Sequence, residues 1–193
     1  MTIFETIRQR RSIGKMTEQS PTRAQIEQIL EAATHAPNHH KTEPWRFVVL
    51  AGHAREELGT VMASILDKQL SQQQFEKRDA LLDKERQKLL RSPVVIVVAS
   101  VHAEQDSRIT EIEDFASVAA AVQNMLLTAE ELGLAAVWRT GEAAYSSTVK
   151  EWLGFSGRDH LVAFLYLGYP AIPRTERQPV PATNKTRWLG WID

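Results

Sequence analysis

Two adjacent arginines and a serine form the first group of residues that could bind a ligand. Arg10, Arg11 and Ser12 follow a short predicted helix near the N-terminus, and Lys15 adds a further positive charge nearby. Guanidinium groups match phosphate oxygens in a bidentate manner, so this turn could hold a phosphate. Basic side chains at a helix C-terminus also complement the helix dipole, and this alternative stays open for the segment alone.

A polar segment between a predicted helix and a predicted strand is the second candidate. His35–Trp45 contains three histidines, one lysine and one glutamate. His35 and His39 have a spacing that suits a metal on a helix, but Pro37 lies between them and breaks that geometry. We therefore expect no metal site here. A solvated loop and a ligand-binding loop remain the alternatives.

The third candidate is the end of a predicted strand. Trp138, Arg139, Thr140 and Gly141 stand where ligands gather in layered α/β structures. Gly141 would let a backbone N–H approach a ligand closely. A simple strand-to-loop turn explains the same residues without any ligand.

Several kinds of chemistry are excluded by what the chain lacks. It has no cysteine, which excludes disulfides, thiolate catalysis and cysteine-ligated zinc or iron–sulfur sites. The glycine-rich phosphate loops and the serine nucleophile elbow are also missing. A bound nucleotide or flavin must therefore be held in another way.

The length and the net charge of the chain limit the class of protein to which it can belong. The 193 residues fit one domain, and the net charge of -1 provides no global basic field for nucleic acid or an anionic membrane. The longest apolar runs, such as Val94–Ala99, are far shorter than the roughly 20 residues of a membrane helix. The N-terminus lacks the apolar region of a signal peptide, so we expect a cytoplasmic protein.

The elements that must position these residues follow from local patterns. Helices are expected over residues 3–9, 22–35 and 113–132, with two or three amphipathic helices between 54 and 91 and a short helix from Ser146 or Ser147 to near Gly154. Strands are expected over Trp45–Leu50, Val94–Ala99, Ala135–Arg139 and Leu161–Leu167. Strand–helix alternation by itself favours a parallel sheet.

The C-terminal segment has no such pattern. Prolines recur after Gly168, and Trp188 and Trp191 fall within the last six residues. Two tryptophans near a chain end need apolar surface to cover them, on this subunit or on a partner.

Taken together and in order, these segments are more specific than any one of them. The ordered set comprises Arg10–Ser12, Ala36–His39, Glu43–Phe47, Trp138–Gly141 and Phe164–Pro170. It resembles the FMN-dependent nitroreductase family, especially its short members, from Ile3 to about Pro173.

The resemblance implies an α+β fold, a three-layer α-β-α sandwich with a mixed, mostly antiparallel central sheet. It implies a single FMN-binding domain over residues 1–193 and an intertwined homodimer. Residues 170–193 would form an extended tail that packs on the partner subunit.

The resemblance also assigns a cofactor site that is shared between subunits. The FMN contacts it implies are Arg10, Arg11, Ser12, Trp138, Arg139 and Thr140 in one subunit, with His35 and His39 from the other. It assigns no catalytic side chain and no metal. Lys15 and Glu43 depart from the family pattern, so it gives neither of them a role.

The function implied is hydride transfer from NAD(P)H through FMN to an electron-poor acceptor, nitroaromatic or quinone-like, in a ping-pong cycle. One alternative is a flavin carrier or sensor without efficient turnover, and another is a family relative that uses the flavin for a different reaction. A third is an interaction protein that binds a partner through the charged Leu66–Lys88 region. Oxidation of NAD(P)H separates enzyme from binder, and colour separates flavoprotein from interaction protein.

Overall fold

Four antiparallel strands form the central sheet in a computed structural model, which describes residues 1–102 and 108–191. The strands are β1 (Trp45–Ala51), β2 (Val94–Ser100), β3 (Ala135–Arg139) and β4 (His160–Gly168), in the order β1-β2-β4-β3. All three strand pairs are antiparallel, and an isolated bridge between Ser12 and Ala136 adds a parallel contact. The mostly antiparallel sheet is therefore confirmed, and the parallel sheet favoured by strand–helix alternation is wrong.

The direction of β2 has a simple cause. The chain leaves β1 at Ala51, runs out along one helix and back along another, and re-enters the sheet at Val94, which pairs with Ala51. A helical hairpin returns the chain to the end of the sheet that it left, so the next strand runs antiparallel to the last.

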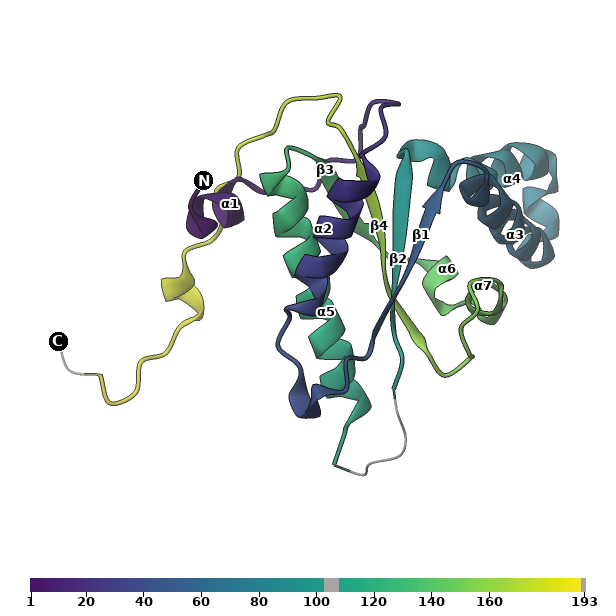
Figure 1. Cartoon of the computed structure of the whole chain (residues 1–193). Coiled ribbons are helices and arrows are strands. Elements are labelled where there is room, and N and C mark those ends of the chain that lie inside the picture. Colours follow the sequence, from purple (N-terminus) through teal and green to yellow (C-terminus); the bar gives the residue numbers. More distant parts are fainter. Residues whose placement is uncertain (103–107, 192–193) are drawn as a thin grey trace.

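Helices cover both faces of the sheet and give three layers (Figure 1). The α-helices are α1 (Ile3–Gln9), α2 (Arg23–Thr34), α3 (His53–Gln69), α4 (Arg78–Arg86), α5 (Glu111–Glu131), α6 (Glu142–Tyr145) and α7 (Ser147–Trp152). Short 3₁₀ turns span His39–Lys41, Gln72–Lys77, Lys88–Arg91 and Ala182–Lys185. Helices α2 and α5 pack on one face, while α3 and α7 pack on the other, and the α-β-α sandwich is confirmed.

The two inner strands carry the core. Every residue of β2 is buried, as its continuous apolar sequence predicts. Alternation along the strand sends Ile96 and Val98 toward α2 and α5, and sends Val95 and Val97 toward the opposite helical layer. Each face of the sheet therefore has its own apolar cluster.

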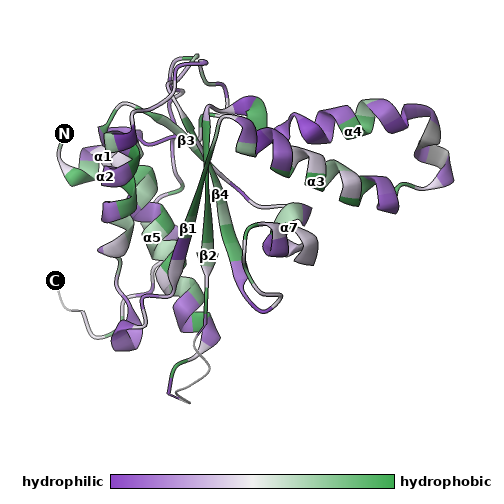
Figure 2. Ribbon diagram, turned by 45° about the vertical axis from the view of Figure 1, so that its right-hand side comes forward, coloured by the Kyte–Doolittle hydropathy of each residue, from purple (hydrophilic) through white to green (hydrophobic). Residues whose placement is uncertain are grey.

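Local signals place the first two helices as expected, whereas α5 begins at Glu111 instead of residue 113 and α6 lies where the sequence predicts no helix. Thr2 with Glu5, and Thr22 with Gln25, form complete capping boxes at the starts of α1 and α2. Helix α2 ends at Thr34, before the proline that stops it. The predicted amphipathic stretch forms α3 and α4, which Figure 2 shows as a projecting hairpin of mixed polar and apolar faces.

Close packing in this hairpin depends on a glycine. An added Cβ at Gly59 of α3 would lie 2.3 Å from the carbonyl oxygen of Arg86. The two helices approach so closely there that no side chain fits without a backbone shift.

The segment after β4 runs away from the sheet over the surface (Figure 1). Several contacts hold its start. The Ala171 N–H donates to the Lys15 carbonyl oxygen, Arg174 pairs with the buried Glu130 of α5 at 2.9 Å, and Arg11 donates to the carbonyl oxygen of Thr175. Farther on, the Trp188 and Trp191 rings contact each other but stay 67% and 69% exposed. In the single chain this apolar surface is uncovered.

Candidate functional site

The N-terminal basic segment lies along the edge of β3. Ser12 bridges Ala136 in parallel, and the Ile13 N–H donates to the Ala136 carbonyl oxygen at 3.1 Å. Two residues on, a Cβ placed on Gly14 would lie 3.5 Å from an Arg139 guanidinium nitrogen. The first and third candidate segments, far apart in the sequence, are therefore neighbours in space.

The two adjacent arginines have different surroundings. The Arg11 guanidinium donates to the carbonyl oxygens of Thr175, Arg8 and Arg10 at 2.8, 2.6 and 2.8 Å. Over residues 1–102 and 108–191, the Arg10 side chain makes no hydrogen bond or ion pair. Arg11 thus ties the end of α1 to the tail, and Arg10 keeps its donors available.

A cavity of about 370 Å³ opens at the C-terminal end of β3. Its lining includes Trp138, Arg139, Thr140, Gly141, Lys88, Arg91 and Tyr166. Lys88 is paired with Glu85 and Glu142 adds one carboxylate to the lining, but Arg91 and Arg139 leave a net positive charge, which favours a ligand that carries or develops negative charge.

Neighbouring groups fix the walls of this cavity. The Trp138 indole lies on the opposite face of the sheet, with the α2–α5 cluster, and its N–H donates to the Val162 carbonyl oxygen at 2.9 Å, so Trp138 borders the cavity through its backbone. The Arg139 guanidinium lies over the Tyr166 ring, 5.9 Å from its centroid. Burial raises the pKa of the Tyr166 hydroxyl, although Arg139 opposes that shift, so Tyr166 is a neutral wall at ordinary pH.

Gly141 leaves the rim of the same cavity open. It has φ of 101° at the start of α6, and no heavy atom lies within 4 Å of an added Cβ. A backbone approach by a ligand is therefore unobstructed at this position.

Lys88 and Arg91 were not expected at the site from the sequence. They belong to a 3₁₀ turn just before β2, inside a charged stretch that reads as solvated surface. The antiparallel register places Val95 of β2 opposite Tyr166 of β4, next to β3. The pairing of β2 with β4 therefore brings the 3₁₀ turn Lys88–Arg91, which precedes β2, next to the cavity.

The histidine segment has a strained backbone. His35 caps the end of α2, and His39 begins the 3₁₀ turn, with its ring edge-on to that of His40. His40, Lys41 and Glu43 have φ of 55°, 54° and 46°, in the left-handed region. Such residues cost on the order of 1–3 kcal/mol each and persist only where the surroundings hold them.

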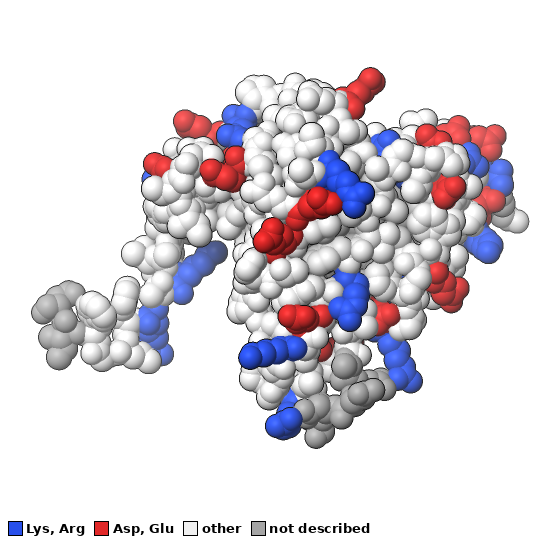
Figure 3. Space-filling model, in the orientation of Figure 1, with Lys and Arg blue, Asp and Glu red and all other residues white. Residues whose placement is uncertain are grey.

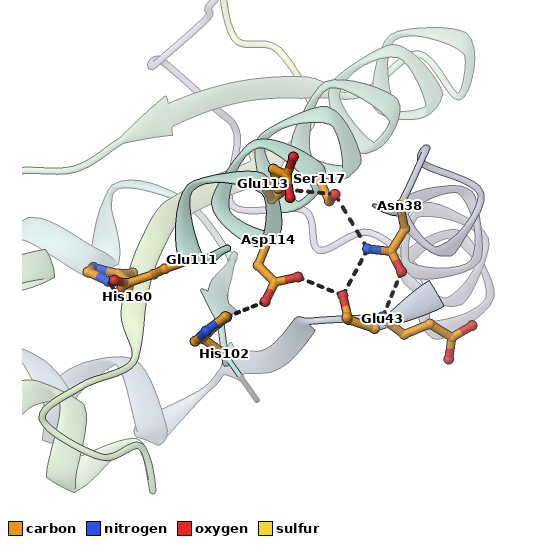
Figure 4. Close-up of polar contacts among 9 residues, drawn as sticks. Asn38, Glu43, His102, Glu111, Glu113, Asp114, Ser117 and His160 are labelled. Carbon is orange, nitrogen blue, oxygen red and sulfur yellow. Dashed lines mark hydrogen bonds and ion pairs between the residues drawn. The ribbon is translucent and has the colours of Figure 1, made fainter. Parts of the chain in front are cut away.

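A partly buried polar network, centred on the buried Asp114, holds this strained loop against the start of α5 (Figure 4). The Asp114 side chain is 2% exposed, and its carboxylate accepts from the Thr42 hydroxyl at 2.6 Å and contacts His102 Nδ1 at 2.6 Å. Asn38 Nδ2 donates to the Thr42 hydroxyl at 3.0 Å, and Asn38 Oδ1 accepts from the Glu43 N–H at 2.7 Å. The network spans the loop and explains how its backbone is maintained.

A second polar pair lies beside this network. His160 of β4 contacts the carboxylate of Glu111 at the start of α5 (Figure 4). This partner lowers the pKa of the exposed Glu111 carboxyl. The pair ties one end of α5 to the sheet.

A single chain does not bring all the predicted site residues together. Across the described ranges, no hydrogen bond or ion pair joins His35 or His39 to Arg10–Ser12 or Trp138–Thr140. In Figure 1 the turn that contains His39 lies at the end of α2 remote from α1. The two departures from the family pattern are both exposed: Lys15 accepts from the Ala171 N–H through its carbonyl oxygen, and Glu43 lies in the strained loop.

Charge and hydropathy of the surface agree with the composition. Basic and acidic side chains are interspersed on the face in Figure 3. Within the ranges that the structure describes, no helix combines the length and apolar character needed to cross a membrane. The same residues contain no group of three or more histidine and carboxylate side chains arranged for a metal ion.

The layered α+β fold is that of the nitroreductase-like proteins. Residues 7–169 match the Nitroreductase family, and the chain belongs to that family. It is 32% identical over 181 residues to the Escherichia coli K12 protein named "Putative NAD(P)H nitroreductase YdjA", covering 94% of this chain and 95% of that protein.

Solved structures agree on the fold. A nitroreductase-like family protein from Bacillus cereus superposes with a TM-score of 0.81 at 26% identity, over 99% of this chain and 97% of that one. A nitroreductase with bound FMN from Bacteroides fragilis gives a TM-score of 0.72 at 20% identity, over 98% and 100%. The nitroreductase fold expected from the sequence is confirmed.

Proposed function

We propose that this protein is an NAD(P)H-dependent FMN oxidoreductase that passes a hydride through FMN to an electron-poor acceptor, nitroaromatic or quinone-like, in a ping-pong cycle. The observation that carries the proposal is the basic Arg10–Ser12 segment lying along β3, which leads to the cation-lined cavity at Arg139. Family membership and the name of the Escherichia coli relative support the same activity.

The groups along β3 fit an elongated anionic cofactor. Ala135 and Arg139 are separated by about 13 Å at roughly 3.3 Å per residue. Free guanidinium donors at Arg10 suit a phosphate at one end. The cationic cavity with an open backbone at Gly141 suits a flavin ring at the other end. FMN has both parts, and the structure of the Bacteroides fragilis relative contains it.

Each residue then has a defined task. FMN, when bound, takes up a hydride from NAD(P)H and gives it to the acceptor. Arg10 and Ser12 would bind the phosphate end, and the segment Trp138–Thr140 at the end of β3 would lie along the ring. Arg139 provides positive charge where the reduced ring carries negative charge. We assign proton donation to no side chain.

We further propose a homodimer in which each flavin site takes residues from both subunits. Helix α1 exposes apolar side chains that a partner would cover: Ile3 is 75% and Phe4 is 65% exposed. His35 and His39, which make no hydrogen bond or ion pair with the β3 edge within the described residues of their own chain, would then meet the flavin of the neighbouring subunit. The tail from residue 170 would pack on that subunit.

The chain as a whole is proposed to act as one FMN-binding domain over residues 1–193, in the cytoplasm. The absence of cysteine suits a reducing compartment.

Absorbance and turnover measurements test the proposal. The purified protein should be yellow, with about one FMN per chain, and should oxidise NADH or NADPH with menadione or a nitroarene as acceptor. A colourless protein that also ignores added FMN in a titration contradicts the proposal. Tight FMN binding without NAD(P)H oxidation would instead favour the flavin carrier or sensor.

The phosphate contact can be tested separately from the ring. Arg10→Ala should weaken FMN binding by about 1.5–3 kcal/mol, the value of a hydrogen bond to a charged group. Riboflavin lacks the phosphate, so titrations should give the variant and the wild type similar riboflavin affinities. Arg23→Ala, which removes an exposed arginine paired with Glu27 on α2, is the matched control and should leave FMN affinity unchanged. An equal loss of riboflavin and FMN affinity in Arg10→Ala would show that Arg10 acts on the fold.

A further inference from the structure

We propose that Asp114 is a positioning residue for the flavin-binding loop, which it holds in its strained conformation through Thr42 and Asn38. The inference rests on the proposed function, because it assumes that the loop bearing His39 meets the flavin. Asp114 itself is buried and would touch neither flavin nor substrate.

Asp114 differs from the other acidic residues at the start of α5 because its carboxylate is buried and hydrogen-bonded. Acidic residues are favoured in the first turn of a helix, and Glu111 and Glu113 of α5 are exposed there in the ordinary way. Asp114 differs, because its side chain is 2% exposed and both of its oxygens are occupied. A buried carboxylate is costly unless it is hydrogen-bonded, so this arrangement fixes its partners tightly.

Thr42 is the link between Asp114 and the loop. Its hydroxyl donates to Asp114 Oδ1 and accepts from Asn38 Nδ2, so both bonds depend on one oxygen atom. Asn38 then accepts from the Glu43 N–H at 2.7 Å and donates weakly to Ser117 at 3.4 Å. Asn38 and Thr42 thus bracket the residues between them.

The bracketed residues are the ones whose conformation needs support. His40 and Lys41 lie inside the bracket with positive φ, and Glu43 directly follows it. Without the bonds of Thr42, the backbone can relax toward common conformations and carry His39 away from its position. The network therefore couples a buried carboxylate to the placement of a predicted flavin contact.

Thr42→Val tests the link with little change in shape. The FMN dissociation constant should rise about tenfold, because the hydroxyl that joins Asp114 to the loop is lost. Thr42→Ser keeps the hydroxyl and should restore affinity to within roughly threefold of wild type. Thr60→Val, which removes a hydroxyl bonded to its own helix α3, is the matched control and should bind FMN as wild type does.

A double-variant cycle tests the route of the effect. Asp114→Ala should also weaken FMN binding, and Thr42→Val/Asp114→Ala should bind no more weakly than Asp114→Ala alone, because both changes break one chain of contacts. Hydrogen exchange of the apoprotein should show faster exchange at the Glu43 amide in Thr42→Val and not in Thr60→Val. Should Asp114→Ala fail to fold, the two Thr42 variants carry the test.

The results that overturn the proposal are distinct. A Thr42→Val protein with an FMN affinity within roughly twofold of wild type would overturn it, whatever its stability. Additive losses in the double variant, or failure of Thr42→Ser to restore binding, would do the same. A wild-type protein that binds no FMN would overturn the proposed function itself, and the present inference would fail with it.

Discussion

Mixing two inactive variants should restore FMN binding. Arg10→Ala/Arg139→Ala damages the β3 edge, and His35→Ala/His39→Ala damages the opposite set of predicted contacts. Each double variant should bind little FMN alone. If sites are built across the dimer, a heterodimer has one site with every residue intact and one that lacks all four. After subunit exchange, each heterodimer should therefore bind about half of the wild-type FMN.

The mixing experiment needs proof that subunits have exchanged. Tagged subunits of different mass, purified as the heterodimer, provide that proof. Heterodimers that bind no more FMN than the separate variants would place both residue sets in one subunit, and the proposed interface assignment would be wrong. As a control, untagged and tagged wild-type subunits are mixed and purified in the same way, which measures how much FMN the procedure itself removes.

Removal of residues 183–193 should weaken both the dimer and FMN binding. The deletion takes away Trp188, Leu189 and Trp191, which are largely exposed in the single chain. Each tryptophan would bury on the order of 150–250 Å² if covered by a partner. Because FMN is expected to bind only the folded dimer, dissociation of the dimer and loss of FMN should appear together. Sedimentation velocity and flavin absorbance at several protein concentrations would measure them.

A full-length variant separates the aromatic side chains from the backbone of the tail. Trp188→Ser/Trp191→Ser keeps the chain length and should reproduce most of the effect of the deletion. A truncated protein that stays dimeric and keeps its FMN would contradict the proposed role of the tail. Loss of FMN from a truncated protein that remains a dimer would instead assign the tail to the flavin site alone.

Local patterns in the sequence were sufficient for most of the secondary structure. The capping boxes at Thr2 and Thr22 lie within single helical turns, so neighbouring residues decide them. The buried strand Val94–Ser100 follows from an uninterrupted apolar run. Strand direction could not be obtained in this way, because it depends on pairs such as Val97 with Phe164, which lie far apart in the chain.

The candidate site likewise contains some residues that the sequence could predict and others that it could not. Arg10–Ser12 and Trp138–Thr140 could be selected by residue type and order, and the structure brings these segments together. Lys88 and Arg91 were missed because charged residues in a polar stretch have an ordinary explanation as solvated surface. Asp114 was missed for a similar reason, since an acid in the first turn of a helix complements the dipole.

The sequence by itself determined where the first two helices begin and that the strand Val94–Ser100 is buried, because these properties depend on residue type and near neighbours. Only the tertiary structure decided that the sheet is antiparallel and that Arg10, not Arg11, keeps free donors. It also decided that a buried carboxylate supports the histidine loop. The sheet direction, the Arg11 bond to Thr175 and the Asp114–Thr42 bond all join segments distant in the chain, and such contacts depend on the packing of the whole core.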